Sequence, residues 1–210
     1  MKTRERIWKT ALTLFNERGF ANVSMRDIAA DLGMSPGNLS YHFPNQESLV
    51  AEHFRQLALL NEETLTINVG PEFCMVDFLR HYRQVYENQF AFRYLLLNLV
   101  PLLDSYPLIR EEYLQRQQSR RDVIFHRILA LAANQQLALK GDLDTIHRLV
   151  GQVAIQARFW LSDAHLSFPG KPGRELIQYY LRLLSEIFFP YLPEEVVRQS
   201  EAFFLSSSQA

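Results

Sequence analysis

Residues Ser24 to Phe43 read SMRDIAADLGMSPGNLSYHF and predict two short helices joined by a glycine turn. Ser24 can cap the first helix, and Asp27, three residues later, can complete a reciprocal capping box. Gly33 stands where a chain leaving a helix commonly needs a left-handed residue. Ser35, followed by a proline, suits the N-cap and first position of the second helix. This spacing is typical of a DNA-reading helix-turn-helix.

The second helix of this pair has a narrow apolar side. Leu39 and Phe43, four residues apart, are expected to be buried, whereas its other side chains are small or polar. A helix of about eight residues is marginal alone in water and must be held by packing against neighbours. The upstream stretch from Thr3 to Arg18 can provide that packing, because its apolar residues follow a helical period. These residues are Ile7, Ala11, Leu14 and Phe15.

The run from Arg4 to Leu49 resembles the N-terminal domain of tetracycline-repressor-like (TetR-family) regulators. Several elements of the family pattern occur in register, which is more specific than a lone helix-turn-helix. They are A-x-x-L-F at Ala11 to Phe15, Gly19-Phe20, S-M-R-D-I-A at Ser24 to Ala29, L-G-M-S-x-G-x-L at Leu32 to Leu39, Tyr41-His42-Phe43, and Asn45-x-Glu47-x-Leu49.

The resemblance implies that the second helix enters the major groove of DNA. It assigns phosphate contact to Ser24 and Arg26, and an arginine in the first turn of a helix opposes the helix dipole, so helix stability does not explain it. Two roles are possible for His42: it could contact DNA, or it could form a structural hydrogen bond at the end of the helix. The resemblance also implies contacts with DNA bases or the DNA backbone for Ser35, Gly37, Asn38, Ser40 and Tyr41.

Two positions depart from the family pattern. Pro44 and Gln46 stand where members of the family often carry lysine, so two phosphate-binding charges are missing. A basic cluster near the N-terminus offers other charges, either as an arm for the phosphate backbone or as a solvated helix start. Its members are Lys2, Arg4, Arg6 and Lys9.

Composition describes a folded protein. The chain has 210 residues, of which 48% are hydrophobic and 21% charged, and its net charge is −1. That charge argues against a protein that coats nucleic acid without selectivity. We expect no secretory leader and no membrane span, and a single cysteine, Cys74, suits a reducing compartment, so a cytoplasmic location is predicted.

The rest of the chain is also expected to be helical, which predicts an all-α fold. A helix from residue 45 to about 69 connects a DNA-binding domain, residues 1–45, to an effector-binding and dimerisation domain, residues 46–210. Breaks are expected at Gly70-Pro71, Pro101, Gly141, Phe168 to Gly173 and Pro190. The later helices are expected at Glu72 to Asn88, Phe90 to Leu99, Pro107 to Leu139, Asp142 to Ala164, Pro172 to Phe189 and Pro193 to Phe204.

Enzyme chemistry is not indicated. The histidines lack the spacing of zinc hydrolases, and the sequence has no cysteine pair, glycine-rich phosphate loop or nucleophile elbow. We therefore expect no catalytic residues, no metal and no cofactor.

A small-molecule cavity is expected in the helical domain, lined by aromatic residues with a few polar groups. The same aromatic residues could instead form an ordinary core. The candidates are Tyr82, Tyr86, Phe90, Phe125, His126, Arg158 and Trp160.

A homodimer is expected, because one short helix reads too few base pairs to discriminate well. Two apolar stripes on the late helices could form a four-helix bundle across a two-fold axis, or could pack within one chain. They comprise Val153, Ala157, Trp160 and Leu161, and Ile177, Leu181, Leu184 and Phe188.

These features predict a transcriptional regulator that binds double-stranded DNA. In this hypothesis a homodimer represses from a palindromic operator and an unknown small-molecule effector releases it. The competing hypothesis is a helical small-molecule or lipid-binding protein whose DNA-binding head is weak or vestigial. A protein adaptor is a third class.

Overall fold

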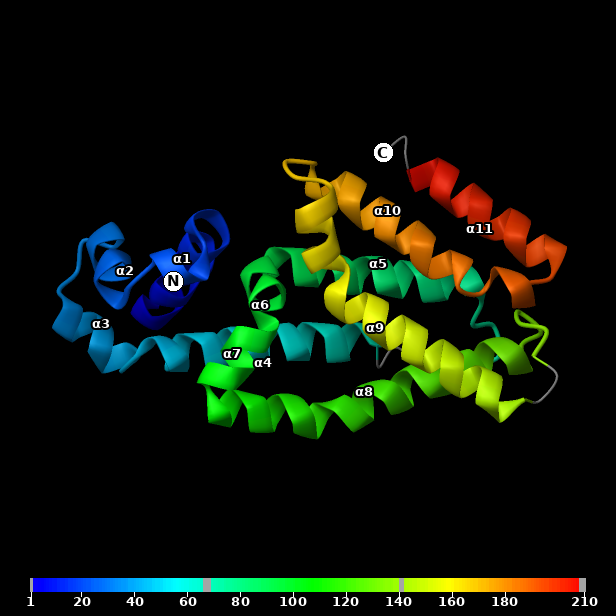
Figure 1. Cartoon of the computed structure of the whole chain (residues 1–210), viewed down its shortest axis with the longest axis horizontal. Helices are drawn as coiled ribbons and strands as arrows, with labels where there is room; N and C mark the ends of the chain where they lie inside the picture. The colour runs from blue at the N-terminus through cyan, green and yellow to red at the C-terminus, as the bar shows by residue number, and fades with distance from the viewer. Residues whose placement is uncertain (1, 66–68, 140–141, 208–210) are drawn as a thin grey trace. The chain divides into compact units, whose positions relative to one another are not determined.

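A computed structural model describes residues 2–65, 69–139 and 142–207. This part of the chain contains helices and no strand (Figure 1), which confirms the predicted all-α fold. None of its helices is long and apolar enough to span a bilayer. The helices are α1 (Thr3–Arg18), η1 (Phe20–Asn22), α2 (Met25–Asp31), α3 (Pro36–His42), α4 (Gln46–Leu65), α5 (Met75–Ala91), α6 (Arg93–Leu97), α7 (Leu99–Ser105), α8 (Pro107–Ala133), α9 (Leu143–Ser167), α10 (Gly173–Glu186), η2 (Phe189–Tyr191) and α11 (Glu194–Ser207).

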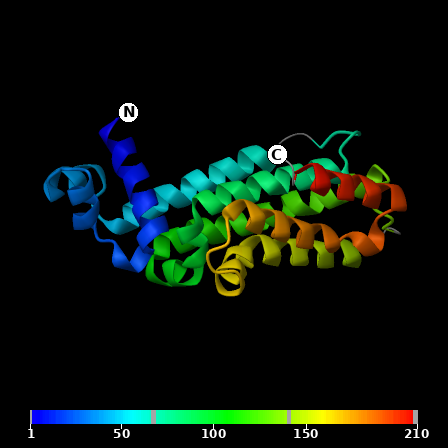
Figure 2. The ribbon, with the colours of Figure 1, turned by 90° about the horizontal axis from the view of Figure 1, so that it is seen from above.

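The helices form two compact units. Unit 1 comprises Met1–Leu60 and Ala91–Tyr113, and unit 2 comprises Asn61–Phe90 and Leu114–Ala210. Within unit 2, α10 packs beside both α9 and α11, as the views in Figures 1 and 2 agree. Unit 1 holds more than the helix-turn-helix, because α6, α7 and the first turns of α8 belong to it. The functional division at residue 45 stays a prediction.

The helices around the turn form as the sequence predicts. The expected apolar side chains of α1, from Ile7 to Phe15, are buried. The capping box of α2 is present, with Ser24 and Asp27 bonded reciprocally. Gly33 takes a φ of 63°, the left-handed conformation that lets α2 end and α3 start a few residues later. Ser35 caps α3 through the Asn38 amide.

Several helix boundaries were predicted wrongly. The helix expected from Phe90 to Leu99 is not continuous, because α5 runs to Ala91 and α6 comprises only Arg93–Leu97. The helix expected to run to Leu139 ends at Ala133, because Gln135 adopts a φ of 58° and the Gln136 amide donates to the Leu131 carbonyl at 2.8 Å. These are the features of a Schellman end, here without the usual glycine. Pro101 does not break the chain but lies in the first turn of α7, where its missing amide costs no helical hydrogen bond. The expected break at Gly141 falls outside the described residues.

Asn16 explains why α6 belongs to unit 1. Its side chain donates from Nδ2 to the Ala91 carbonyl at the end of α5, at 2.7 Å. Its Oδ1 accepts from the Tyr94 amide in the first turn of α6, at 3.1 Å. One amide side chain on α1 therefore satisfies backbone groups at both sides of the corner between α5 and α6.

His53 of α4 lies fully buried at the centre of unit 1. Its Nε2 lies 3.0 Å from the Trp8 carbonyl, which can only accept, so the ring proton is assigned to Nε2. Its Nδ1 then accepts from the Tyr94 hydroxyl at 2.6 Å. The neutral ring thus joins α1, α4 and α6, and burial lowers the pKa of His53 to about 4.

We predict that this histidine makes folding sensitive to acid. Its pKa rises on unfolding towards 6.5, so the unfolded state binds more protons between the two values and stability falls as pH falls from 6.5 towards 4. The free energy of unfolding should lose up to about 1.4 kcal/mol per pH unit in this window. Urea titrations at several pH values measure this slope, and His53→Gln should flatten it. His81, whose pKa burial also lowers, titrates in the same direction and remains in both proteins. Equal slopes in the two proteins would contradict the assignment.

Candidate DNA-binding surface

Helix α3 presents one buried and one exposed side. Leu39 and Phe43 are 0% and 1% exposed and anchor the helix in unit 1. The other side carries the predicted contact residues Gly37, Asn38, Ser40 and Tyr41, all of which are exposed. Tyr41 is 84% exposed, which is unusual for so large a ring. A ring held open to solvent on a small-residue helix is available to a groove of DNA.

The first turn of α2 is the second part of this surface. Arg26 is exposed and, in the described part of the chain, forms no ion pair, so its guanidinium is available to a phosphate. Ser24 is less available, because its hydroxyl accepts from the Asp27 amide and donates to the Asp27 carboxylate at 2.6 Å. These bonds from Ser24 lower the pKa of Asp27 and keep the carboxylate charged.

Gln46, which departs from the family pattern, and its neighbours Asn45 and His42, which match it, make local contacts. Gln46, at the start of α4, donates from Nε2 to the Val23 carbonyl at 2.8 Å and so ties α4 to the segment before α2. Asn45 caps α4 by accepting from the Ser48 amide at 2.9 Å. The His42 ring lies edge-on to Tyr41, with centroids 5.2 Å apart. The start of α4 is therefore held by neutral hydrogen bonds from Gln46 and Asn45.

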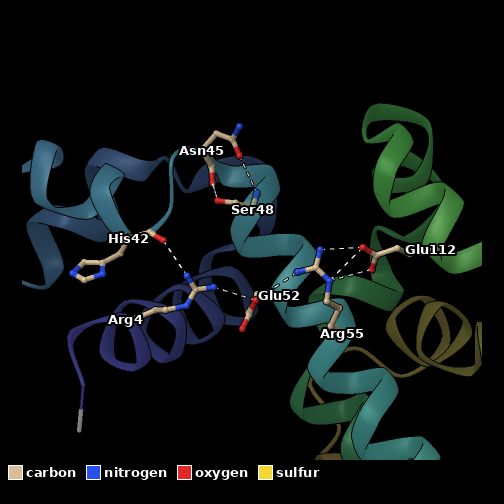
Figure 3. A network of polar contacts seen from close by, with 7 residues as sticks. All are labelled: Arg4, His42, Asn45, Ser48, Glu52, Arg55 and Glu112. Carbon is tan, nitrogen blue, oxygen red and sulfur yellow. Dashed lines mark hydrogen bonds and ion pairs between the residues drawn. The ribbon is translucent and has the colours of Figure 1, made fainter.

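The basic cluster at the N-terminus divides in the structure. Lys9 pairs with Glu5 on its own helix at 2.9 Å. Arg4 instead enters a network of polar contacts that sequence reasoning missed (Figure 3). It donates to the His42 carbonyl and to the Glu52 carboxylate, each at 3.2 Å. No sequence motif signals these contacts, because they join residues far apart in the chain.

The network continues along α4 to α8. Arg55 lies 3.6 Å from the Glu52 carboxylate. Its guanidinium also binds Glu112 through two nitrogens, at 3.0 to 3.3 Å, and this hydrogen bonding raises the pKa of Arg55. Figure 3 shows the four charged side chains in one line from the end of α3 to the start of α8. All four belong to unit 1.

Three of the predicted cavity residues meet in unit 2. Tyr82, Tyr86 and Trp160 are buried, and the Tyr86 and Trp160 rings stack with centroids 4.8 Å apart. Trp160 donates from Nε1 to Gln89 at 2.6 Å. The Tyr86 hydroxyl is buried and has no hydrogen-bond partner in the described part of the chain. This cluster is closely packed and leaves one polar atom unsatisfied.

The other predicted cavity residues lie elsewhere. His126 is exposed and hydrogen bonds to the Asp122 carbonyl of its own helix, so it does not supply a polar group to the interior. Phe125 is half-buried and stacks on His147 at 5.2 Å. Arg158 donates to Gln117 at 2.6 Å. Phe90 is half-buried, and its ring packs against Gly173 so closely that a Cβ there would lie 2.4 Å away.

The residues of the predicted dimer stripes are largely buried within unit 2, as in the alternative that both stripes pack within one chain. Six of these side chains are 0% to 3% exposed, and Ile177 is 9% exposed, so they pack within unit 2 and cannot meet a partner without repacking. The helical period correctly identified an apolar face, but that face is the one turned inward. Ala157 is only half-buried. The buried residues are Val153, Trp160, Leu161, Ile177, Leu181, Leu184 and Phe188.

Metal-binding groups are scattered in the part of the chain that the structure describes. No three His, Cys, Asp or Glu side chains there come close enough together to hold a metal ion. The thiol of Cys74 donates to Asp77 at 3.2 Å, and burial raises its pKa.

A capped helix pair with a polar outer helix, followed by a helical body, defines a helix-turn-helix transcriptional regulator. Comparison with known families agrees with this class. Residues 7–53 match the family described as bacterial regulatory proteins, tetR family, and residues 51–199 match the family described as bacterial transcriptional repressor. The chain belongs to the TetR family of transcriptional regulators, as the resemblance in its first fifty residues predicted.

Individual relatives match parts of the chain. The probable HTH-type transcriptional regulator YttP of Bacillus subtilis is 25% identical in an alignment of 130 residues that covers 54% of this chain and 61% of YttP. The HTH-type transcriptional regulator UidR of Escherichia coli K12 is 42% identical over 48 residues, 23% of this chain and 24% of UidR. The matches thus span less than two thirds of these relatives' lengths.

A solved structure matches nearly the whole chain. The crystal structure of a TetR-family transcriptional regulator from Marinobacter aquaeolei VT8 superposes with a TM-score of 0.88 at 26% identity. The superposition covers 97% of this chain and 99% of that one. The proteins matched are regulators and not enzymes.

Substitutions on the outer side of α3 should weaken DNA binding without unfolding the chain. Tyr41→Ala and Asn38→Ala remove exposed side chains, so thermal unfolding should stay within about 0.5 kcal/mol of the unchanged protein. Each should cost about 1 to 3 kcal/mol in binding a selected duplex, measured by fluorescence anisotropy. Leu39→Ala, on the buried side of the same helix, should instead destabilise by about 2 to 5 kcal/mol. Unchanged affinity in both surface variants would remove them from the reading surface.

Proposed function

We propose that this protein is a sequence-specific, DNA-binding transcriptional regulator in the cytoplasm, a repressor that a small-molecule effector releases from a palindromic operator. The exposed, polar side of α3 carries the proposal. Leu39 within α3 and Phe43 directly after it are buried and anchor this seven-residue helix, which leaves Tyr41 open at 84% exposure. Arg26 at the start of α2 supplies an adjacent positive charge. Family membership supports the same function.

Operator recognition requires two such helices. One α3 can read only a few base pairs, and each good bidentate contact is worth about 1 to 3 kcal/mol of discrimination. A homodimer that places two α3 helices about 34 to 36 Å apart, or a multiple of it, reads both halves of a palindrome. Symmetry of the protein is then matched by symmetry of the operator.

For the dimer surface we infer the outward faces of α9 and α10, which replace the buried stripes. On α9, Ile155 and Phe159 lie four residues apart and are 62% and 40% exposed. Leu166 continues that side of the helix at 80% exposure. On α10, Tyr179 and Leu183 are again four apart and exposed. Apolar side chains gathered on two packed helices favour burial against a second copy.

A charge placed on this surface should separate the protomers. In a symmetric dimer, Phe159→Glu would place one unpaired carboxylate from each protomer in the interface. This should raise the dimer dissociation constant about a hundredfold or more. Light scattering after gel filtration measures the mass, and circular dichroism checks the fold. Leu114→Glu, an exposed leucine of α8 in the same unit, is the matched control and should stay dimeric. A Phe159→Glu protein that remains a dimer would exclude this surface.

Effector binding is proposed for the aromatic cluster of unit 2. The Tyr86 hydroxyl there is buried and unsatisfied within the described residues, which costs about 1 to 3 kcal/mol. A ligand with a hydrogen-bond acceptor would recover that energy. Release from DNA needs a coupling of only about 1 to 3 kcal/mol, which weakens operator binding about 5- to 150-fold.

The alternative function is a helical small-molecule or lipid-binding protein with a weak or vestigial head. It is favoured by the missing lysines at Pro44 and Gln46 and by the Ser24 hydroxyl being occupied in its own capping box. In that case the aromatic cluster of unit 2 would be the primary site.

The dependence of DNA binding on salt separates the two functions. Gel-shift and anisotropy titrations with duplexes from around the coding region of this protein should show selective binding whose log affinity falls steeply with log salt concentration. A flat or absent response would favour the carrier. A ligand that binds without changing the affinity for DNA would exclude the release step and leave DNA recognition intact.

A further inference from the structure

Arg4 occupies an unusual place for a cation at the N-terminus of a DNA-binding head. Its Nη1 donates to the carbonyl of His42, the last residue of α3, at 3.2 Å. Its Nη2 donates to Glu52 of α4 at 3.2 Å. Its guanidinium carbon lies 4.3 Å from the centre of the Phe43 ring. One side chain from α1 therefore contacts the end of α3, the residue after it and α4.

These contacts suit a guanidinium better than any other side chain. The carbonyls at the C-terminus of a helix carry partial negative charge and lack partners within the helix. The planar fork of arginine can donate to such a carbonyl and to a carboxylate together, and its flat face can lie on an aromatic ring. A lysine donates from a single nitrogen and has no flat face, so it cannot place two separate nitrogens on the carbonyl and the carboxylate while lying flat on the ring.

The position of Arg4 is itself fixed by further charges. Glu52, which accepts from Arg4, also lies 3.6 Å from Arg55, and Arg55 is held by two nitrogens on Glu112 of α8. Exposed ion pairs contribute little to stability one at a time. Alternating charges in a line nevertheless define one orientation for each side chain, and the line ends at the α3 carbonyl (Figure 3).

We propose that Arg4 is a positioning residue for the recognition helix: through His42 and Phe43 it fixes the C-terminal end of α3, and Glu52 holds it there. Arg4 in this role does not bind phosphate, although it belongs to the basic cluster that a phosphate-binding arm would use. The inference rests on the proposed DNA-binding function. Arg4 would then influence sequence specificity without touching DNA, because it holds the helix that carries the reading surface.

A positioning role and a phosphate-binding role for Arg4 predict different results in DNA-binding experiments. The probes are a duplex enriched by the unchanged protein from a random-sequence library and a scrambled duplex of the same length. Arg4→Gln should weaken binding to the enriched duplex about 3- to 5-fold per head, or about 10- to 25-fold for a dimer. Binding to the scrambled duplex should weaken much less, and its slope against log salt should fall by clearly less than one per head. Arg4→Lys should resemble Arg4→Gln, because charge alone does not restore the fork.

Glu52→Gln is the sharper variant. It removes a negative charge, which by electrostatics alone would strengthen binding to every duplex. If Glu52 holds Arg4 in position, this variant should instead lose affinity for the enriched duplex. Arg6→Gln is the matched control, an exposed cation two residues along α1, and should leave the ratio of the two affinities unchanged.

Three outcomes would overturn the proposal. In the first, Arg4→Gln weakens both duplexes equally and lowers the salt slope by about one per head, as expected for a lost phosphate contact. In the second, Arg4→Lys binds the enriched duplex as well as the unchanged protein does. In the third, Glu52→Gln binds it equally or more tightly.

Hydrogen exchange separates failure of this inference from failure of the proposed function. Without DNA, Arg4→Gln and Glu52→Gln should accelerate exchange of the amides from Leu39 to Phe43, whereas Arg6→Gln should not. If the unchanged protein enriches no sequence, the DNA-binding function fails, and this measurement still decides whether Arg4 positions α3. Equal exchange in all the proteins would overturn the positioning role even where DNA binds.

Discussion

The burial of Leu39 and Phe43 is the interaction on which the proposed DNA-reading surface depends. Helix α3 has only seven residues, and a helix of that length does not persist in water by itself. With two side chains fully buried, the remaining positions need contribute nothing to the core. The outer side can therefore consist of small and polar residues around one open tyrosine. In the proposed function, stability and recognition are divided between the two sides of a single short helix.

Polar contacts then determine where this helix lies. Gln46 and Asn45 fix the start of α4. Arg4 donates a hydrogen bond to the last carbonyl of α3, and Asn16 joins α1 to the corner before α6. Each of these bonds satisfies a backbone group that a helix end leaves without a partner. The compact unit that contains the reading helix consequently extends to α6, α7 and the beginning of α8.

The charge balance of the head follows from the same contacts. Lysines common in the family are replaced by Pro44 and Gln46, and Arg4 is held by a carbonyl and a carboxylate. Arg26 remains exposed at the N-terminus of α2, where a bound phosphate would meet both the guanidinium and the helix amides. In the proposed function, recognition would thus depend more on the fit of α3 in the groove than on total positive charge.

The sequence by itself determined the elements whose signals are local: the capping box at Ser24 and Asp27, the left-handed Gly33, the proline start of α3 and the helical period that buries Ile7 and Leu39. It could not show that Gln135 would end α8, because a left-handed glutamine is stabilised by its surroundings and leaves no glycine to recognise. Nor could it tell which apolar stripes of α9 and α10 face inward, since periodicity defines a face but not its neighbour. The partners of Arg4 and His53 were decided by the tertiary structure alone, because each of these contacts spans about forty residues of chain. Local backbone geometry is encoded by neighbouring residues, whereas burial and charge pairing depend on what folding brings alongside.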